Sequence, residues 1–271
     1  MKKIFSVMAA MVLLLVFGTG AGASAAGNDA MVRIVHASPD APAVDVVVDG
    51  KTVVEGAAFK AATDYMMLPA GEHKVEVFAA GTVADGKPVI SSNLTVEAGM
   101  AYTVAAINKL DSLELKVLND DLNVTKGKSK VRVAHFSPDA PAVDVAVKGG
   151  DVLFPGAEFK GVTQYLEVDP GSYDLEVRGA GTKDVVLDLA GTELKANMSY
   201  TVIAVGLAKG EPALEALVLA DPAMMPSEMP KTGMGGTADT QSHNYLPVAA
   251  AAILGLGALM AYGIKKKASS H

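Results

Sequence analysis

Two short blocks of the sequence carry residue types that could do chemistry, and the blocks are nearly identical. The first is HASPDAPAVDV, starting at His36, and the second is HFSPDAPAVDV, starting at His135. With the arginine three residues before each block, the repeated polar residues are Arg33, His36, Ser38, Asp40 and Asp45 in the first copy, and Arg132, His135, Ser137, Asp139 and Asp144 in the second. A serine near a histidine and an aspartate suggests a hydrolase, and a histidine with carboxylates suggests a metal site.

The sequence has features that argue against both the hydrolase and the metal site. A hydrolase needs the serine Oγ within hydrogen-bond reach of the imidazole. Pro39 and Pro42 indicate a turn at this point, and no Gly-x-Ser-x-Gly elbow surrounds Ser38. No second histidine lies nearby for a metal, and calcium bound by Asp40 and Asp45 is the least implausible ion. Catalysis around His36 and its copy therefore stays an alternative.

A structural role explains more of these residues. A hydroxyl and a carboxylate in SPDAP can accept backbone N–H groups, while the two prolines fix the backbone of a turn. We expect Asp45, inside an apolar strand, to form a cross-strand ion pair with Arg33. His36 is expected to pack or hydrogen-bond at the strand end. The two blocks are then nearly identical because both domains need the same turn at this place.

The repeat extends over whole domains. The matching segments are VRIVHASPDAPAVDV and VRVAHFSPDAPAVDV, GAAFKAATDYMMLPAGEHKVEV and GAEFKGVTQYLEVDPGSYDLEV, AYTVAAI and SYTVIAV, and LKVLNDD and LEALVLAD. They keep their order with shifts of one or two residues, which indicates a tandem duplication. We place the first domain at residues 31–120, a polar linker at 119–130, and the second domain at 131–221. The linker, NDDLNVTKGKSK, is expected to permit some relative motion.

Each unit has the pattern of an all-β domain. Short runs rich in valine and other β-branched residues alternate partly with polar residues, and turn signals such as Asp49-Gly50 separate them. About seven strands at this spacing predict two tandem antiparallel β-sandwiches of immunoglobulin-like or transthyretin-like shape. No segment in either unit predicts a major helix.

Three motifs resemble a known family. The H-x-SPDAP-x-VDV opening, the GxxF…T-x-Y block and the PG-x-(Y/H)-x-(V/L)-E-V strand are similar to those of DUF4397, a bacterial secreted β-sandwich domain often found in tandem. The resemblance covers both units and implies the same fold. The family has no established biochemical function, so the resemblance implies no activity.

The N-terminal segment has the pattern of a secretory signal peptide. Lys2 and Lys3 precede an apolar run from Val7 to Phe17, and small residues follow. Ala23 and Ala25 fit the A-x-A pattern of a signal peptidase site. We therefore expect residues 1–25 to be removed on export.

The C-terminal segment has the order of parts of a wall anchor. A spacer, residues 222–245, contains MPKTG at 229–233; an apolar segment at 246–264 predicts a transmembrane helix, and the basic tail, 265–271, is expected to be cytoplasmic. This order resembles the LPxTG sorting signal of Gram-positive surface proteins. The resemblance implies that sortase cuts between Thr232 and Gly233 and joins Thr232 to peptidoglycan. Pro230 also matches the motif, Lys231 is its free position, and Met229 replaces the usual leucine.

Composition excludes several functional classes. The chain has no cysteine, which excludes disulfides and thiolate chemistry. Removing residues 1–25 and everything after Thr232 takes away five of the 23 basic and one of the 30 acidic residues, leaving a net charge of −11. Such a charge argues against a nucleic-acid partner.

These observations together predict a non-enzymatic surface protein with a structural or binding role and no cofactor. Its expected partners are signal peptidase and sortase as processing enzymes, peptidoglycan as the covalent anchor, and the membrane before sorting. The surface ligand stays unknown. The alternatives are a ligand-binding adhesin and a surface hydrolase with sites around His36 and His135.

Overall fold

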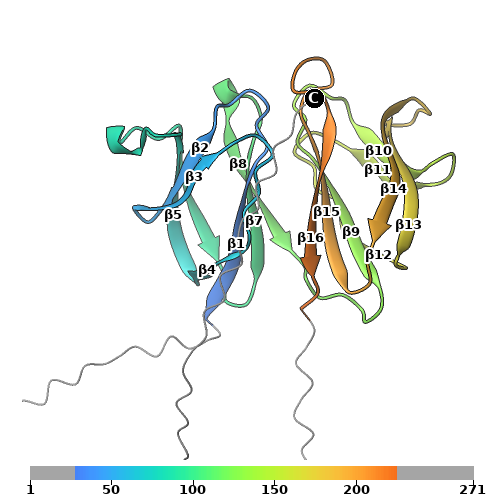
Figure 1. Cartoon of the computed structure of the whole chain (residues 1–271), viewed down its shortest axis with the longest axis horizontal. Coiled ribbons are helices and arrows are strands. Elements are labelled where there is room, and N and C mark those ends of the chain that lie inside the picture. The colour runs from blue at the N-terminus through green and yellow to red at the C-terminus, as the bar shows by residue number, and fades with distance from the viewer. Residues whose placement is uncertain (1–27, 225–271) are drawn as a thin grey trace, which may run out of the picture. The chain divides into compact units, whose positions relative to one another are not determined.

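The computed structural model describes residues 28–224, which fold into two β-sandwiches (Figure 1). The strands of the first sandwich are β1 (Asp29–His36), β2 (Val44–Val48), β3 (Lys51–Ala57), β4 (Met66–Pro69), β5 (Gly71–Ala79), β6 (Ile90–Val96), β7 (Ala101–Ile107) and β8 (Glu114–Asp120). Those of the second are β9 (Ser129–His135), β10 (Val143–Val147), β11 (Val152–Ala157), β12 (Leu166–Val168), β13 (Gly171–Gly179), β14 (Val185–Leu194), β15 (Met198–Val205) and β16 (Glu215–Pro222). Two 3-10 turns, η1 (Val83–Asp85) and η2 (Leu110–Ser112), complete the elements. The predicted all-β pair of tandem sandwiches is confirmed.

Each sandwich consists of two four-stranded sheets. The orders are β4-β1-β7-β8 and β3-β2-β5-β6 in the first, and β12-β9-β15-β16 and β11-β10-β13-β14 in the second. Neighbouring strands run antiparallel, as predicted, except for one pair in each sandwich: β1 with β7, and β9 with β15, run parallel. The sequence did not predict these pairs, because side-chain alternation has the same period in both kinds of ladder.

The predicted turn at Asp49-Gly50 joins β2 to β3. Both residues have positive φ, 51° for Asp49 and 78° for Gly50. This is the backbone of a two-residue hairpin turn whose twist matches that of the flanking strands. Asp49 tolerates this conformation better than most residues, and Gly50 has no Cβ to oppose it.

Each sandwich has an apolar core between its two sheets. The first core contains Ala30, Val32, Ile34, Val44, Val46, Val75, Val77, Leu94, Val96, Tyr102 and Val104. The second contains Val131, Val133, Val143, Val145, Phe154, Ala157, Val177, Leu194 and Tyr200. In β1 and β2 the core side chains occupy alternate positions, as expected for strands that face a core on one side.

A third apolar cluster joins the two sandwiches. It combines Val35, Ala37, Ala105, Ile107 and Leu118 of the first with Ala134, Phe136, Ile203, Val205 and Leu219 of the second. These are matching positions of the two copies. Every residue of β7 and of β9 is buried, because these strands have apolar neighbours on both faces. This burial explains why such strands alternate only partly in sequence.

The linker between the sandwiches is held at several points. Leu122 and Val124 are buried, as is Asp120 at the end of β8. Nζ of Lys130 donates to the carboxylate of Asp121 and to the carbonyl of Asn123, both at 2.5 Å. The relative motion expected from the polar composition of this segment is therefore opposed by contacts that its sequence did not predict.

The remaining predictions for the chain ends lie outside the described residues. These are the signal peptide at 1–25, the MPKTG motif at 229–233, the helix at 246–264 and the tail at 265–271. Within residues 28–224, no helix is long and apolar enough to cross a membrane.

Candidate functional site

The two repeated histidines close the turn that follows them. Nε2 of His36 lies 3.0 Å from the carbonyl oxygen of Pro42, and Nε2 of His135 lies 3.0 Å from that of Pro141. A carbonyl oxygen only accepts, so Nε2 carries the proton in both rings. Nδ1 of His36 accepts the backbone N–H of Ser38 at 3.3 Å. Burial lowers the pKa of both histidines, which keeps the rings uncharged.

Neither repeated serine has the contact that a nucleophile needs. Ser38 and Ser137 are fully buried. Oγ of Ser137 lies 3.4 Å from the carboxylate of Asp139, and Oγ of Ser38 has no hydrogen-bond partner within residues 28–224. Because both ring nitrogens of His36 are bonded to the backbone of its own turn, neither can take a proton from a hydroxyl. In the second copy, Nδ1 of His135 has no hydrogen-bond partner within residues 28–224, but Ser137 Oγ bonds to Asp139 and not to the ring. Neither copy therefore has the serine-to-imidazole hydrogen bond of a hydrolase.

The first repeated aspartate ties the turn to a neighbouring loop. Oδ1 of Asp40 accepts the backbone N–H of Leu110 at 2.8 Å. In the second copy, Asp139 accepts the N–H groups of Ala208 at 2.7 Å and Lys209 at 2.9 Å. Although burial opposes ionisation, these two bonds hold the pKa of Asp139 below its ordinary value.

The second repeated aspartate holds two backbone segments and does not form the predicted ion pair. Asp45 accepts the N–H groups of Gly56 and Gly81, each at 2.7 Å. Asp144 accepts the N–H groups of the matching glycines, Gly156 at 2.7 Å and Gly181 at 2.9 Å. The prediction of a pair with Arg33 was wrong: β1 and β2 belong to different sheets, so the side chains are not cross-strand neighbours. Two charge-assisted bonds to the backbone satisfy the buried carboxylate instead.

The repeated arginines join the two sandwiches reciprocally. Nη1 of Arg33, on β1, donates to Oδ1 of Asp221, on β16, at 2.7 Å. Nη2 of Arg132, on β9, pairs with Oδ1 of Asp120, on β8. The arginines match in the two copies, and so do the aspartates, which lie opposite Ala101 and Ser199 in their ladders. Exchanging the two copies therefore maps one Arg–Asp pair approximately onto the other.

We call these four residues, Arg33, Asp120, Arg132 and Asp221, the Arg–Asp clasp. The carboxylate of Asp120 has the most partners among them. Its Oδ2 accepts Thr103 Oγ1 at 2.6 Å and the Tyr65 hydroxyl at 2.7 Å. Nη2 of Arg33 lies 3.8 Å from the same oxygen. The Asp120 side chain is fully buried, so its charge depends on these contacts.

Threonines and tyrosines orient the two guanidinium groups. Nε of Arg33 donates to Thr103 Oγ1 at 2.7 Å, and Nε of Arg132 donates to Thr201 Oγ1 at 3.0 Å. The guanidinium carbon of Arg33 lies 4.7 Å from the centre of the Tyr65 ring, and that of Arg132 lies 4.7 Å from the centre of the Tyr165 ring. Stacking of this kind stabilises a desolvated cation.

Burial shifts the pKa of two groups at the clasp, Asp221 and the neighbouring Tyr65. It raises the pKa of the Asp221 carboxyl, against the opposing effect of Arg33, and it raises the pKa of the Tyr65 hydroxyl. The tyrosine therefore stays protonated and donates to Asp120. Sequence reasoning missed both aspartates and both tyrosines. The one available signal was that each recurs at the same place in both copies.

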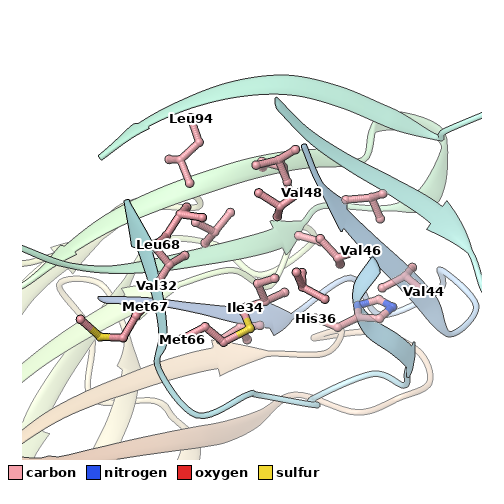
Figure 2. A pocket seen from close by; sticks show the side chains of 17 residues that line it. Val32, Ile34, His36, Val44, Val46, Val48, Met66, Met67, Leu68 and Leu94 are labelled. Carbon is pink, nitrogen blue, oxygen red and sulfur yellow. The ribbon is translucent and has the colours of Figure 1, made fainter. Parts of the chain in front are cut away.

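An apolar cavity of about 70 Å³ lies within the first sandwich (Figure 2). Side chains from both sheets surround it, among them Val32 and Ile34 of β1, Val46 and Val48 of β2, and Met67 of β4. His36 contributes the one ionisable side chain of the lining, and its ring nitrogens are already bonded. Sequence reasoning did not find this cavity, because the strands around it read as an ordinary core.

The metal alternative has no geometric support in the described part of the chain. Asp40 and Asp45, the pair considered for calcium, bind backbone N–H groups of different elements, Leu110 of η2 and Gly56 of β3. Residues 28–224 contain no group of three histidine, aspartate or glutamate side chains placed to hold an ion.

Comparison with solved structures finds similar chains at low identity. A "putative cell adhesion protein" from Bacteroides eggerthii is 12% identical, with 73% of this chain and 97% of that chain covered, at a TM-score of 0.22. Proteins of the same description from Bacteroides fragilis (11% identical, 74% and 99% covered, TM-score 0.18) and Parabacteroides distasonis (10%, 73% and 100%, 0.20) also match. A comparison with curated proteins found no match.

Comparison with family models agrees with the duplication. One model matches twice, at residues 30–146 and 129–229. The two matches begin with the first strands of the two sandwiches, at Asp29 and Ser129, and the first match runs on into β10. Together they span most of the chain, which therefore belongs to the family described as "Domain of unknown function (DUF4397)".

Proposed function

We propose that the chain is a non-enzymatic surface protein whose two sandwiches act as one rigid module for outward display. The observation that carries this proposal is the reciprocal Arg–Asp clasp, together with the apolar cluster that the two copies share. Buried charges and apolar side chains on both partners make separation of the sandwiches costly. The geometry therefore supports a binding or structural unit in which the two sandwiches keep one fixed arrangement.

A non-enzymatic role is supported by the repeated block. His36, Asp40 and Asp45 bond to backbone groups that explain their presence. Within residues 28–224, the buried polar atoms of the repeated residues without a hydrogen-bond partner are Arg33 Nη2, Ser38 Oγ and His135 Nδ1. A Ser-His hydrolase needs a hydrogen bond from the serine hydroxyl to a ring nitrogen, and within residues 28–224 neither Ser38 nor Ser137 makes one. A ligand-binding adhesin remains compatible with the same display role.

We propose export and wall anchoring for the same protein. Signal peptidase would cut after Ala25, and sortase would join Thr232 to peptidoglycan, leaving the module outside the cell. The MPKTG motif with its apolar segment and basic tail supports this proposal. Mass analysis of wall digests should find a C-terminal Thr232 linked to a peptidoglycan amine. Intact chain confined to the membrane of sortase-positive cells would contradict it.

Calorimetry tests the rigid module directly. Every strand and core cluster described lies within residues 28–224, so a fragment of residues 26–232 retains all of these contacts. We expect a single cooperative unfolding transition for this fragment, because the shared cluster couples the sandwiches. The double variant Arg33→Ala, Arg132→Ala should split it into two. Two separate transitions in the unmodified fragment would refute the rigid module.

A further inference from the structure

Within residues 28–224, His73 is the one histidine outside the repeated blocks, and it is buried near the start of β5. Nδ1 of its ring lies 2.6 Å from Oδ2 of Asp49, in the β2–β3 turn, and Nε2 lies 2.7 Å from the carbonyl oxygen of Pro69, the last residue of β4. β4 and β5 belong to different sheets of the first sandwich. The ring therefore joins the β2–β3 turn to the corner where the chain passes from one sheet to the other.

Both contacts can form together only while the ring is charged. A carbonyl oxygen accepts and does not donate, and the ionised carboxylate of Asp49 does the same, so each ring nitrogen must carry a proton. A neutral imidazole has a single N–H and would turn a lone pair toward one of the two oxygens. Loss of one proton therefore breaks one of the two contacts, and it also removes the charge that attracts Asp49.

The surroundings of the ring favour its charged form. Burial lowers the pKa of His73, but the bonds to Asp49 and to the Pro69 carbonyl outweigh it, so the pKa is raised above its ordinary value of 6.5. The bond to His73 and a bond from the backbone N–H of Lys74 lower the pKa of the Asp49 carboxyl. Both partners therefore carry their charges over a common range of pH.

Asp49 is the charged group that faces the ring from a neighbouring element. The contact from β4 is a backbone carbonyl, and β6 presents the apolar Leu94, which lies opposite His73 in the ladder with β5. On β5 itself, Glu72 and Lys74 point to the other face of the sheet, because side chains alternate along a strand. The charge of the ring is therefore set mainly by one carboxylate.

The second sandwich replaces both members of the pair. Tyr173 stands at the position of His73, and its hydroxyl donates to the matching carbonyl, that of Asp169, at 2.7 Å. At the turn, Lys148 takes the place of Asp49 and keeps the same backbone bond to the strand beside it. The corner is thus held in both copies, but in the second copy by an uncharged donor. Both members of the pair differ together between the copies, which is expected if they act as one unit.

We propose that His73 and Asp49 form a proton-dependent latch on the first sandwich, and that loss of the ring proton loosens the corner between β4 and β5. The latch is closed below pH 6.5, and it opens as the pH rises through the raised pKa of the ring. The second sandwich, whose corner is held by Tyr173, does not respond. The proposal goes beyond the display role and does not depend on it.

Nuclear magnetic resonance of the 26–232 fragment, titrated from about pH 5 to about pH 9, tests the latch. Both ring nitrogens of His73 should carry protons at low pH, and the midpoint of the ring titration should lie above 6.5. Backbone amide signals of Gly71 and Lys74 should change with the same midpoint, whereas those of Gly171 and Asp174, at the matching positions, should not. A midpoint at or below 6.5, or unchanged amide signals at Gly71 and Lys74, would overturn the proposal.

Substitutions at the two corners provide matched variants. Asp49→Asn removes the charge of the acceptor and should lower the His73 midpoint by about half a pH unit, the size expected for a partly exposed pair. Asp188→Asn removes the acid that pairs with Lys148 at the matching corner, and it should leave that midpoint unchanged. The double variant Asp49→Lys, His73→Tyr copies the second sandwich and should abolish the pH dependence of the Gly71 signal.

An unchanged midpoint in Asp49→Asn, or a Gly71 signal that still follows pH in a folded double variant, would contradict the latch. Should the double variant fail to fold, the titrations of the unmodified fragment and of Asp49→Asn decide. A failure here leaves the calorimetric test of the rigid module untouched.

Discussion

Replacing Asp120 by asparagine should destabilise the protein far more than the same change at Asp221. The Asp120 side chain is fully buried and receives the Arg132 pair and two hydroxyl donors. Breaking a buried pair by removing one charge costs about 3–5 kcal/mol, because the remaining charge stays buried without compensation. Arg132, whose side chain is 4% exposed, would be left in that state.

The expected effect at Asp221 is smaller. Its side chain is 11% exposed and accepts one charged hydrogen bond, from Arg33. A bond of this kind contributes about 1.5–3 kcal/mol, and burial already raises the pKa of this carboxyl. Arg33 also keeps Asp120 at 3.8 Å when Asp221 is changed. The two matching positions should therefore differ by about 2 kcal/mol.

Urea unfolding of the 26–232 fragment, followed by circular dichroism, measures the difference. With a slope of about 2 kcal/mol per molar urea, Asp120→Asn should lower the midpoint by about 2 M and Asp221→Asn by about 1 M. Asp169→Asn is the control, because Asp169 pairs with Lys128 at an exposed site and should change stability by less than about 1 kcal/mol. A midpoint for Asp120→Asn no lower than that of the control would refute the reasoning.

Three further outcomes are expected. As the pH falls below 6.5, the unfolded chain binds protons at His36 and His135 that the folded protein does not bind, because burial lowers their folded pKa, so stability falls. His73 acts in the opposite sense, because its bond to Asp49 raises its folded pKa although burial opposes this. The double variant His36→Gln, His135→Gln should therefore lose the fall in stability between about pH 7.5 and pH 5.5 and keep only the opposite dependence of His73, and an unchanged slope would contradict the assignment. Asp45→Ala should cost about 3 kcal/mol in thermal unfolding, since two backbone N–H groups lose a charged acceptor, and a loss below about 1 kcal/mol would count against it. At about 24 cal/mol per Å³, the cavity of about 70 Å³ costs about 1.7 kcal/mol. Val75→Leu should therefore stabilise the protein by up to about 0.8 kcal/mol, whereas the reverse change at the matching position, Leu175→Val, should destabilise it. Equal signs in thermal unfolding would show that the first core has no room for the added methylene.

The fold class could be read from the sequence because it depends on local patterns. Partial alternation of β-branched residues, turn signals such as Asp49-Gly50, and the duplication itself predict two sandwiches without any knowledge of long-range contacts. The structural role of SPDAP was also predictable in outline. Two prolines and two acceptors in five residues restrict the backbone to a turn, and His36 closes it.

The partners of the charged residues were not predictable in the same way. Arg33 was expected to pair with Asp45, which is twelve residues away, but it pairs with Asp221, 188 residues away. Strand order decides which side chains meet, and neither the parallel pair of β1 and β7 nor the contact between the copies leaves a local signature. A polar linker likewise looks the same in sequence whether it is mobile or buried.

The sequence by itself determined that one β-sandwich was built twice, since hydrophobic period and turn chemistry act over a few residues. Only the tertiary structure decided that the outer faces of two sheets join through the Arg–Asp clasp, and that Phe154 and Leu175 are buried in one sandwich while the other keeps a cavity. These features depend on the summed volumes and charges of side chains from distant strands. Close packing responds to a single methylene, and no local pattern records that sum.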